Sequence, residues 1–292
     1  MIDRITKIFQ RNLPLENREA TWDWCLAHNQ QVPITVENLE NMADNNLCFG
    51  FFGGSYIGNT DEDHDLRCRY SLKKLSESLG AKEDLSDIEE KLGFRINLPT
   101  FVGGRKVVMT NKGILSDRHI HYLWVMKKII ELCPDRNSSI IEIGAGLGLL
   151  GYFLDKAGYK DYTTIDLAYP SLAQSYFLYK NLPEREMILS GEVQNPFSLN
   201  YKNALKLLHS TDFENYKDRW DIMINMDSLP EMKIEEAIKY INSEVPLLLS
   251  INRENYNFRV FDLAPKYRTL IYRKPFVLRN DSAYFEELYQ KP

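Results

Sequence analysis

Three alternating glycines are the residues of this chain whose spacing points most directly to chemistry. Gly144, Gly146 and Gly148 follow the apolar run Ile140–Ile143, which contains a single carboxylate, Glu142. Glycine alone lets a backbone turn this tightly and lie flat against a ligand. The segment therefore predicts a buried parallel strand that turns directly into a helix, with a nucleotide-like molecule bound at the turn.

An acidic residue stands where a ligand at such a turn would need one. After the glycines, apolar side chains recur at helical spacing, and a second apolar strand, Tyr162–Ile165, ends in Asp166. In a strand, turn, helix and strand unit, a carboxylate roughly 20 residues after the glycines reaches a ribose diol. Gly144 and Asp166 together therefore predict a ribose-bearing cofactor.

Two cofactor classes and one ligand-free alternative fit the glycines. The segment Gly146–Gly151 also satisfies the G-x-G-x-x-G pattern of NAD-binding folds. That pattern requires its first glycine immediately after the strand, and Gly144 already occupies this place. The register therefore favours E-x-G-x-G-x-G over the NAD pattern, while an ordinary glycine-rich turn without a ligand stays open.

With Glu142 in the strand and the three glycines after it, the segment resembles motif I of the class I S-adenosylmethionine-dependent methyltransferases. By this resemblance Gly144, Ala145 and Gly146 would line the methionine part of the cofactor, and Asp166 would hold the ribose hydroxyls. The cofactor implied is S-adenosylmethionine. Further candidates for cofactor contacts lie in the motif I strand and at later strand ends: Glu142, Leu167, Glu192 and Asn225.

These further candidates do not all have the same basis. Asn225 comes near the carboxyl end of an apolar strand, where open α/β sheets bind ligands. Glu192 follows the short strand Met187–Ser190, where it could meet the adenine or lie in a plain loop. Leu167 comes directly after Asp166 and is included through the resemblance.

Other segments resemble a narrower group, the sugar O-methyltransferases found among bacterial polysaccharide and surface-glycan genes. The resemblance covers residues 113–253 and depends on the segments 142–148, 166–167, 225–232 and 251–253. The chain departs from this group at Ala168–Pro170, where an acidic continuation is expected. The resemblance implies an enzyme that transfers a methyl group from S-adenosylmethionine to a hydroxyl of a sugar or glycan precursor.

A sugar hydroxyl must lose its proton as it attacks, so a general base is expected near the methyl group. Asp227 is the first candidate because it ends the apolar strand Trp220–Asp227, although it could equally cap a helix. Glu231, or one of the two first-turn helical histidines His119 and His121, could share or replace this role, with His121 as the preferred one. Asp227 and Glu231 could instead bind a divalent cation. The sequence offers no complete ligand set, so no metal is predicted.

Alternating strands and helices from residue 115 onward would position these residues. A helix over Asp117–Cys133, with Ser116 as its N-cap, leads into the glycine strand. Strands 187–190, 220–227 and 245–251 would complete a parallel core, and the tail would add an antiparallel pair. The fold class that the resemblance implies is α/β: a Rossmann-like, seven-stranded, mostly parallel sheet with helices on both faces.

Residues 1–114 lack this alternation. We expect them to form a mainly helical accessory region that shapes the substrate pocket or a subunit interface, and we expect 115–292 to form the methyltransferase domain. The segment 72–92 predicts one or two charged helices. The segment 100–109 predicts a hairpin because Gly103–Gly104 suits a two-residue turn.

Two other stretches of this region have a structural and a functional interpretation. The aromatic, glycine-rich stretch 47–58 is expected to pack tightly between elements, with a ligand wall as the alternative. The acidic stretch 61–65 is expected to be a solvated loop, with a metal site as the alternative.

Composition restricts the partners. The chain has 292 residues, 44% of them hydrophobic, and a net charge of −5, so no nucleic-acid partner is expected. Its four cysteines are scattered and indicate neither zinc nor disulfides. No apolar run reaches the roughly 18 residues of a membrane span. We expect a soluble, cytoplasmic protein that acts on a small-molecule or glycan substrate, with or without a linked nucleotide; homo-oligomerisation stays open.

Two other functions compete with methyl transfer. An NAD(P)-dependent oxidoreductase would bind a nicotinamide cofactor and transfer hydride. A catalytically silent methyltransferase-fold module, kept for assembly with other glycan enzymes, would bind no cofactor. The joint presence of Gly144, Gly146 and Asp166 favours the enzyme, because these residues have no reason to stand together without a ligand.

Overall fold

The structure is a computed structural model, which describes a defined part of the chain. The described residues are 2–15, 30–42, 45, 47, 61–101, 108–110, 112–254, 257–280 and 283–292. Most of the aromatic, glycine-rich stretch 47–58 and the predicted Gly103–Gly104 turn lie outside these residues. The predictions made for those two segments therefore stay predictions.

The described residues contain one large sheet of eight strands in the order β5-β6-β4-β3-β7-β8-β10-β9. All neighbouring pairs from β5 to β8 are parallel, and β10 runs antiparallel to both β8 and β9. The strands are β3 (Ile140–Ile143), β4 (Tyr162–Asp166), β5 (Met187–Leu189), β6 (Leu205–His209), β7 (Ile222–Met226), β8 (Leu247–Arg253), β9 (Thr269–Pro275) and β10 (Tyr284–Gln290). The predicted α/β class is confirmed, with one strand more than the seven expected.

The additional strand changes the sheet position of one predicted element. β6, which the sequence analysis did not identify, lies beside β4, and the predicted strand β5 lies at the sheet edge. Lys206 interrupts the apolar pattern of β6, yet its side chain is only 1% exposed and its Nζ lies 2.9 Å from Asp161 Oδ1. The strand was missed because a lysine inside it is neutralised by a partner outside it.

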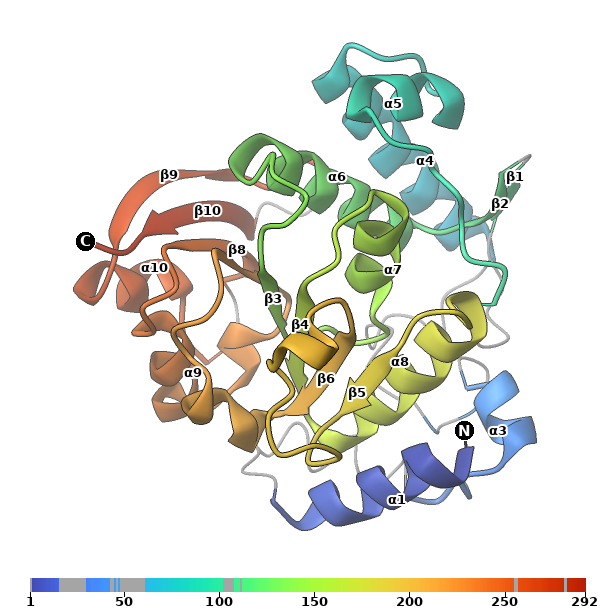
Figure 1. Ribbon diagram of the computed structural model, residues 1–292. Coiled ribbons are helices and arrows are strands. Elements are labelled where there is room, and N and C mark those ends of the chain that lie inside the picture. Colours follow the sequence, from blue (N-terminus) through green and yellow to red (C-terminus); the bar gives the residue numbers. More distant parts are fainter. Residues whose placement is uncertain are drawn as a thin grey trace.

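Helices cover both faces of this sheet (Figure 1). On one face lie α6 (Asp117–Leu132), α7 (Leu149–Lys156) and α8 (Ala168–Asn181), and on the other α9 (Ile234–Ile241) and α10 (Val260–Leu263). Successive residues of β3 point to opposite faces, so Ile140 packs in one buried cluster and Ile141 and Ile143 in the other. The glycine strand is therefore buried on both sides, as its apolar run predicts.

The helix before the glycine strand has the predicted ends. The side chain of His119 accepts the Ser116 amide at 3.0 Å, which satisfies one free amide of the first turn of α6. The helix ends at Leu132, and Cys133 is its C-cap. Asp117, the first residue of the helix, is followed in this first turn by Arg118.

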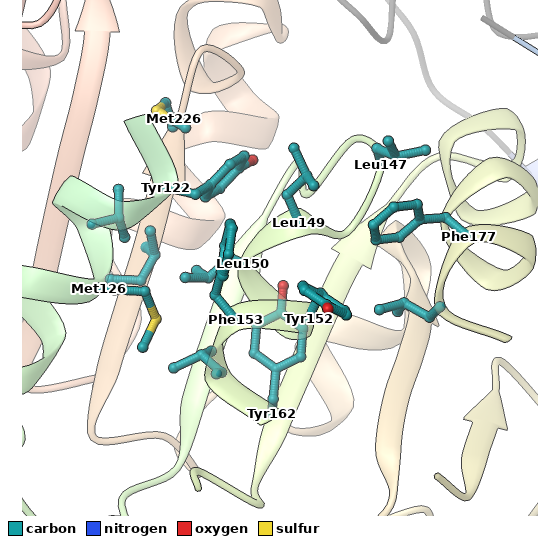
Figure 2. Close-up of a cluster of buried hydrophobic side chains, with 14 of the residues drawn as sticks. Tyr122, Met126, Leu147, Leu149, Leu150, Tyr152, Phe153, Tyr162, Phe177 and Met226 are labelled. Carbon is teal, nitrogen blue, oxygen red and sulfur yellow. The ribbon is translucent and has the colours of Figure 1, made fainter. Parts of the chain in front are cut away.

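The layer between α6, α7 and β4 is filled by large side chains (Figure 2). Tyr122 and Met126 of α6 lie on the same side of this layer as Met226, and Leu150, Phe153 and Tyr162 fill its centre. A Cβ at Gly151 would lie 2.4 Å from the ring of Tyr162. Gly151 is therefore required by helix–strand packing, whichever ligand binds at the preceding turn.

The described part of residues 1–114 is mainly helical. It contains α1 (Ile2–Asn12), α3 (Val36–Glu40), α4 (Asp61–Leu79), α5 (Leu85–Leu92) and the short strands β1 (Val108–Thr110) and β2 (Gly113–Leu115). Short 3-10 turns among the described residues are η1 (Leu13–Leu15), which follows α1, and, after residue 190, η4 (Leu199–Tyr201), η5 (Ser210–Asn215), η6 (Leu229–Glu231) and η7 (Ala264–Lys266).

One prediction for this region needs correction. The stretch 61–65 is not a loop but the start of α4, where Asp65 pairs with Arg69 one turn later at 2.5 Å. β1 pairs antiparallel with β2, a hairpin that the sequence analysis did not predict, while the hairpin predicted over 100–109 stays a prediction. The one or two helices predicted over 72–92 are observed as the end of α4 and as α5.

The accessory region shares its core with the rest of the chain. Ile5, Leu75 and Ile88 belong to the same buried cluster as Ile120 of α6 and Leu150 of α7. Figure 1 shows α1 lying along α8. The division of the chain at residue 114 stays a prediction, and the two parts are not separated by solvent. Among the described helices, none has both the length and the apolar character that a membrane span requires.

Candidate functional site

The glycine turn has the conformation that its sequence predicts. Gly144, Gly146 and Gly148 have φ values of 71°, 56° and 83°, in the left-handed region that side chains disfavour. The Gly144 amide donates to the Ile165 carbonyl at 2.9 Å, so the turn is tied to the end of β4. α7 begins directly after the turn, at Leu149.

A second reason for glycine at position 144 comes from the segment that follows β7. A Cβ there would lie 2.2 Å from Ser228 Oγ, which is closer than real contacts allow. Ser228 Oγ donates to the Ile143 carbonyl at 2.9 Å, and Asn225 Nδ2 donates to the same carbonyl at 2.9 Å. Asn225 in turn accepts a hydrogen bond from Asn252 Nδ2 at 2.8 Å. Asn225 therefore holds the strand ends together beneath the turn.

Asp166 lies at the carboxyl end of β4 and is bonded to the turn. Its Oδ2 accepts the Gly146 amide at 2.9 Å, and its Oδ1 accepts the Leu167 amide at 2.8 Å. The residue is 9% exposed. Asp166 is therefore tied to the glycine turn through Gly146 and to the start of α8 through Leu167. Ala145, between the two glycines, is fully buried.

Glu142 lies beneath the turn, inside the core. Its side chain is fully buried and accepts a hydrogen bond from the Tyr162 hydroxyl through Oε2. Burial raises the pKa of Glu142 to about 8, although the bond from Tyr162 acts in the opposite direction. Its Oε1 has no hydrogen-bond partner among the described residues. This carboxyl group is therefore protonated near neutral pH and belongs to the core at β3 and β4, and its predicted contact with the cofactor stays a prediction.

Asp227 forms ion pairs with two arginines. It follows β7 with φ 66°, unusual for a residue with a side chain. Its Oδ2 accepts hydrogen bonds from Arg118 Nη1 at 2.5 Å and from Arg279 Nη2 at 2.6 Å. Burial alone would raise the pKa of Asp227, but Arg279 and Arg118 lower it to about 2. At neutral pH this carboxylate is ionised and is a weak base.

The other two predicted catalytic residues lie on different elements. Glu231 ends η6, one turn after Asp227, and its amide donates to the Ser228 carbonyl at 3.0 Å. His121 is 1% exposed; its Nε2 lies 3.4 Å from Ser71 Oγ, and its ring packs edge-on against Phe276. Burial and the nearby Arg279 lower the pKa of His121 to about 3, so this histidine is neutral.

Glu192 is bound to the N-terminal helix. Arg4 donates to both oxygens of Glu192, through Nη2 at 2.6 Å and also through Nε. The Leu189 amide donates to Glu192 Oε2 at 2.7 Å. Because β5 is the edge strand, the loop that carries Glu192 is separated from Asp166 by β6. Its predicted contact with adenine stays a prediction.

The neighbour of Asp166 in the sheet is His209, the last residue of β6. Asp212 Oδ2 accepts the His209 amide at 3.1 Å and the Ser190 hydroxyl at 2.7 Å. The Nε2 atom of His209 is buried and has no hydrogen-bond partner within the described part of the chain. Sequence reasoning missed His209 and Asp212 because it missed β6, and the available signal was a strand end beside a predicted ribose site.

The sequence analysis also missed Arg118 and Arg279, although it named their partner Asp227. No group of three or more histidine, cysteine or carboxylate side chains suited to a metal ion occurs among the described residues. The site is thus built from a glycine turn, one strand-end carboxylate beside it, and an arginine–aspartate–arginine cluster at the end of β7.

Comparisons with known proteins find only a distant similarity to solved structures. No protein-family model and no curated protein matches it. Solved structures match weakly. Magnesium protoporphyrin IX methyltransferase from Synechocystis PCC 6803, solved with bound S-adenosylmethionine, is 15% identical with a TM-score of 0.39, over 59% of this chain and 80% of that one.

Two other structures match at a similar level. The glycopeptide N-methyltransferase MtfA, in complex with S-adenosylhomocysteine, is 12% identical with a TM-score of 0.40, over 57% of this chain and 88% of that one. The methyltransferase domain of bacterial CtHen1 is 12% identical with a TM-score of 0.40, over 60% of this chain and 97% of that one. Similarity of this degree assigns no function by itself.

Proposed function

We propose that this chain is an S-adenosylmethionine-dependent methyltransferase. The observation that carries the proposal is the hydrogen bond between Gly146 in the left-handed glycine turn and Asp166 at the end of the adjacent parallel strand. A turn with three left-handed glycines next to a strand-end carboxylate is suited to a nucleoside whose ribose meets the acid. The E-x-G-x-G-x-G register at residues 142–148 supports S-adenosylmethionine over NAD.

The residues fit this cofactor. Asp166 lies at the end of β4 beside the turn, and a carboxylate is an acceptor that suits the hydroxyls of a ribose. Gly144, Ala145 and Gly146 would line the methionine part, and Leu167 would lie beside the ribose. Ser228 already fills the space beside Gly144 on one side, so the methionine part would contact the turn elsewhere. When bound, the cofactor supplies a sulfonium-activated methyl group.

We place the adenine near the carboxyl end of β6 rather than at the edge strand. His209 is the sheet neighbour of Asp166, and its buried Nε2 lacks a partner among the described residues. Glu192 stays a second candidate, although Arg4 already engages both of its oxygens. Asn225 would act by holding the ends of β3, β7 and β8 together.

For the acceptor we propose a hydroxyl of a sugar or glycan precursor, on the resemblance to the sugar O-methyltransferases. The chain's own contribution would be to align that hydroxyl, since correct alignment is the largest requirement of an in-line displacement. Asp227, Glu231 and His121 stay the candidates for the proton acceptor. The low pKa of Asp227 and the burial of His121 make Glu231 the better placed of the three.

The test is a transfer assay with the full chain. We expect incubation with S-adenosylmethionine and a panel of nucleotide sugars and glycan fragments to yield a product one methylene mass heavier, detected by mass spectrometry. Asp166→Ala should abolish the product, and Asp262→Asn, an exposed substitution on α10, should not. Hydride transfer to a nicotinamide cofactor instead of methyl transfer would refute the proposal.

A further inference from the structure

Two arginines from distant parts of the chain converge at the end of β7. Arg118 comes from the first turn of α6, and Arg279 from the connection between β9 and β10. Both donate to the same oxygen of Asp227, Oδ2. The side chains of both arginines are 19% exposed and that of Asp227 is 16% exposed, so an incoming ligand can reach the cluster.

The cluster holds hydrogen-bonding capacity that the protein does not use. Arg279 donates to Asp227 and, through Nη1 at 2.5 Å, to the Tyr284 hydroxyl, and its guanidinium carbon lies 4.1 Å from the centre of the Tyr284 ring. Its buried Nε has no partner among the described residues, and neither has Asp227 Oδ1. A buried donor without a partner is unfavourable, so a further acceptor is expected there.

The charges around the cluster favour an anion. Asp227 balances one of the two guanidinium charges. Asp117 also lies close, but its Oδ1 accepts the Arg118 amide at 2.9 Å, and its charge therefore faces the amino terminus of α6. His121 carries no charge at neutral pH because burial lowers its pKa. The two guanidinium groups and the one carboxylate of the cluster together carry a formal charge of +1, which favours an anionic ligand.

We infer that Arg118 and Arg279 bind an oxyanion carried by the methyl acceptor, a phosphate or a carboxylate. The planar guanidinium groups match either anion through paired hydrogen bonds. Asp227 is then a positioning residue that holds the two arginines together before the acceptor arrives. The inference rests on the proposed methyl transfer, and it names the acceptor class as an anionic sugar rather than a neutral one.

Calorimetric titration of the full chain, saturated with S-adenosylhomocysteine, tests the inference. The probes are glucose 1-phosphate, glucuronate and glucose. We expect one or both anionic probes to bind at least about tenfold more tightly than glucose, and the stronger of the two identifies phosphate or carboxylate as the natural group. Equal affinity for all three probes would overturn the inference.

Variants provide a second, directional test. Arg279→Gln and Arg118→Gln should each weaken binding of the anionic probe by about tenfold or more. Asp227→Asn should strengthen it, because asparagine keeps an oxygen that can accept from the arginines while the competing carboxylate charge is lost. The matched control is Arg259→Gln, which removes the same charge from an exposed pair with Asp262. Weaker anion binding in Asp227→Asn would overturn the inference, and this arm remains available if an arginine variant does not fold.

The result is separable from the proposed function. A chain that binds S-adenosylhomocysteine but shows no preference for anionic probes contradicts the inference alone. A chain that does not bind S-adenosylhomocysteine contradicts the proposed function, and the anion titration is then repeated without it. Preference for the anionic probes under those conditions would support the arginine site but not methyl transfer.

Discussion

Two carboxylates close to the glycine turn have opposite surroundings. Glu142 lies in the middle of β3 and is paired in the sheet with Thr164, fully buried among tyrosines. Asp166 ends β4 and accepts two backbone amides at the turn. The first is held protonated as part of the core, whereas the second presents oxygens at a strand end. Position along the strand, rather than residue type, separates a carboxyl group buried in the core from one that lies at a strand end.

Glu142 makes stability depend on pH. Its folded-state pKa of about 8 exceeds the ordinary value of 4.5, so the folded chain holds this proton more tightly than the unfolded chain. The stabilisation is complete below pH 4.5 and is lost as the pH rises to about 8. Relative to Glu142→Gln, the wild-type free energy of unfolding should fall by up to about 1.4 kcal/mol per pH unit in that window.

Urea unfolding of both proteins across this pH range measures the effect. Glu235→Gln, an exposed substitution on α9, is the control and should follow the wild-type curve. Parallel curves for wild type and Glu142→Gln would show that the buried carboxyl does not retain its proton.

Asp166 allows a prediction about binding. Asp166→Asn keeps the size of the side chain but removes its charge and half of its acceptor capacity. Hydrogen bonds to charged groups contribute about 1.5–3 kcal/mol, so affinity for S-adenosylhomocysteine should fall by roughly tenfold to a hundredfold. Calorimetry measures the change, and circular dichroism checks that the variant is folded. Unchanged affinity would remove Asp166 from the ribose site.

Residues near one another in sequence were predictable, and residues brought together by the fold were not. Gly146 and Asp166 belong to one strand, helix and strand unit, so their spacing alone predicted that they meet. Arg279 and Arg118 are 52 and 109 residues from Asp227, and no local pattern relates them to it. The arginine cluster therefore required the three-dimensional arrangement of β7, α6 and the β9–β10 connection.

At the scale of elements, the glycine turn is fixed by two separate requirements. Gly144 has a left-handed φ, and Ser228 fills the space where a Cβ would be. Gly158, after α7, also has a left-handed φ of 92°, but nothing lies within 4 Å of its Cβ position. Comparing Gly144 with Gly158 therefore separates the cost of backbone strain from the cost of steric overlap.

Alanine substitutions at these two glycines should differ in cost. Gly158→Ala should destabilise by about 1–2 kcal/mol, from left-handed strain alone. Gly144→Ala should add about 1–3 kcal/mol for the overlap with Ser228. The double variant Gly144→Ala with Ser228→Gly should regain the part of the stability that Gly144→Ala loses through overlap with Ser228. Urea unfolding measures all three, and equal losses for the two single variants would contradict the account.

The failure to predict β6 from the sequence also has a physical explanation. β6 contains Lys206, which breaks the apolar pattern, and its charge is balanced by Asp161, the residue immediately before β4. A pattern of apolar residues cannot reveal an ion-pair partner that lies elsewhere in the sequence. The sequence analysis therefore did not place β6 between β4 and the edge strand β5, whose following loop carries Glu192.

At the scale of the whole molecule, the parallel strands bring their carboxyl ends to one edge, where Asp166, His209 and Asp227 all lie. The sequence analysis predicted this architecture because strands and helices alternate after residue 115. It could not predict how the accessory region attaches, since that depends on contacts between distant helices. α1 lies along α8, and Arg4 binds Glu192 beyond β5.

The shared core predicts that the two regions do not fold separately. A fragment of residues 115–292 would expose the side of α6 that packs against α4, and the buried cluster would lose Ile5, Leu75 and Ile88. We expect this fragment to unfold at a lower urea concentration than the full chain or to aggregate. Cooperative unfolding of the fragment at the full chain's midpoint would instead identify 115–292 as an independent domain.

The central claim is that the glycine turn and Asp166 bind S-adenosylmethionine. Its most direct test is calorimetric titration of the full chain with S-adenosylhomocysteine and, in parallel, with NADH. The account predicts saturable binding of S-adenosylhomocysteine at one site per chain and no binding of NADH. A folded chain that ignores S-adenosylhomocysteine, or that binds NADH in its place, would contradict the account.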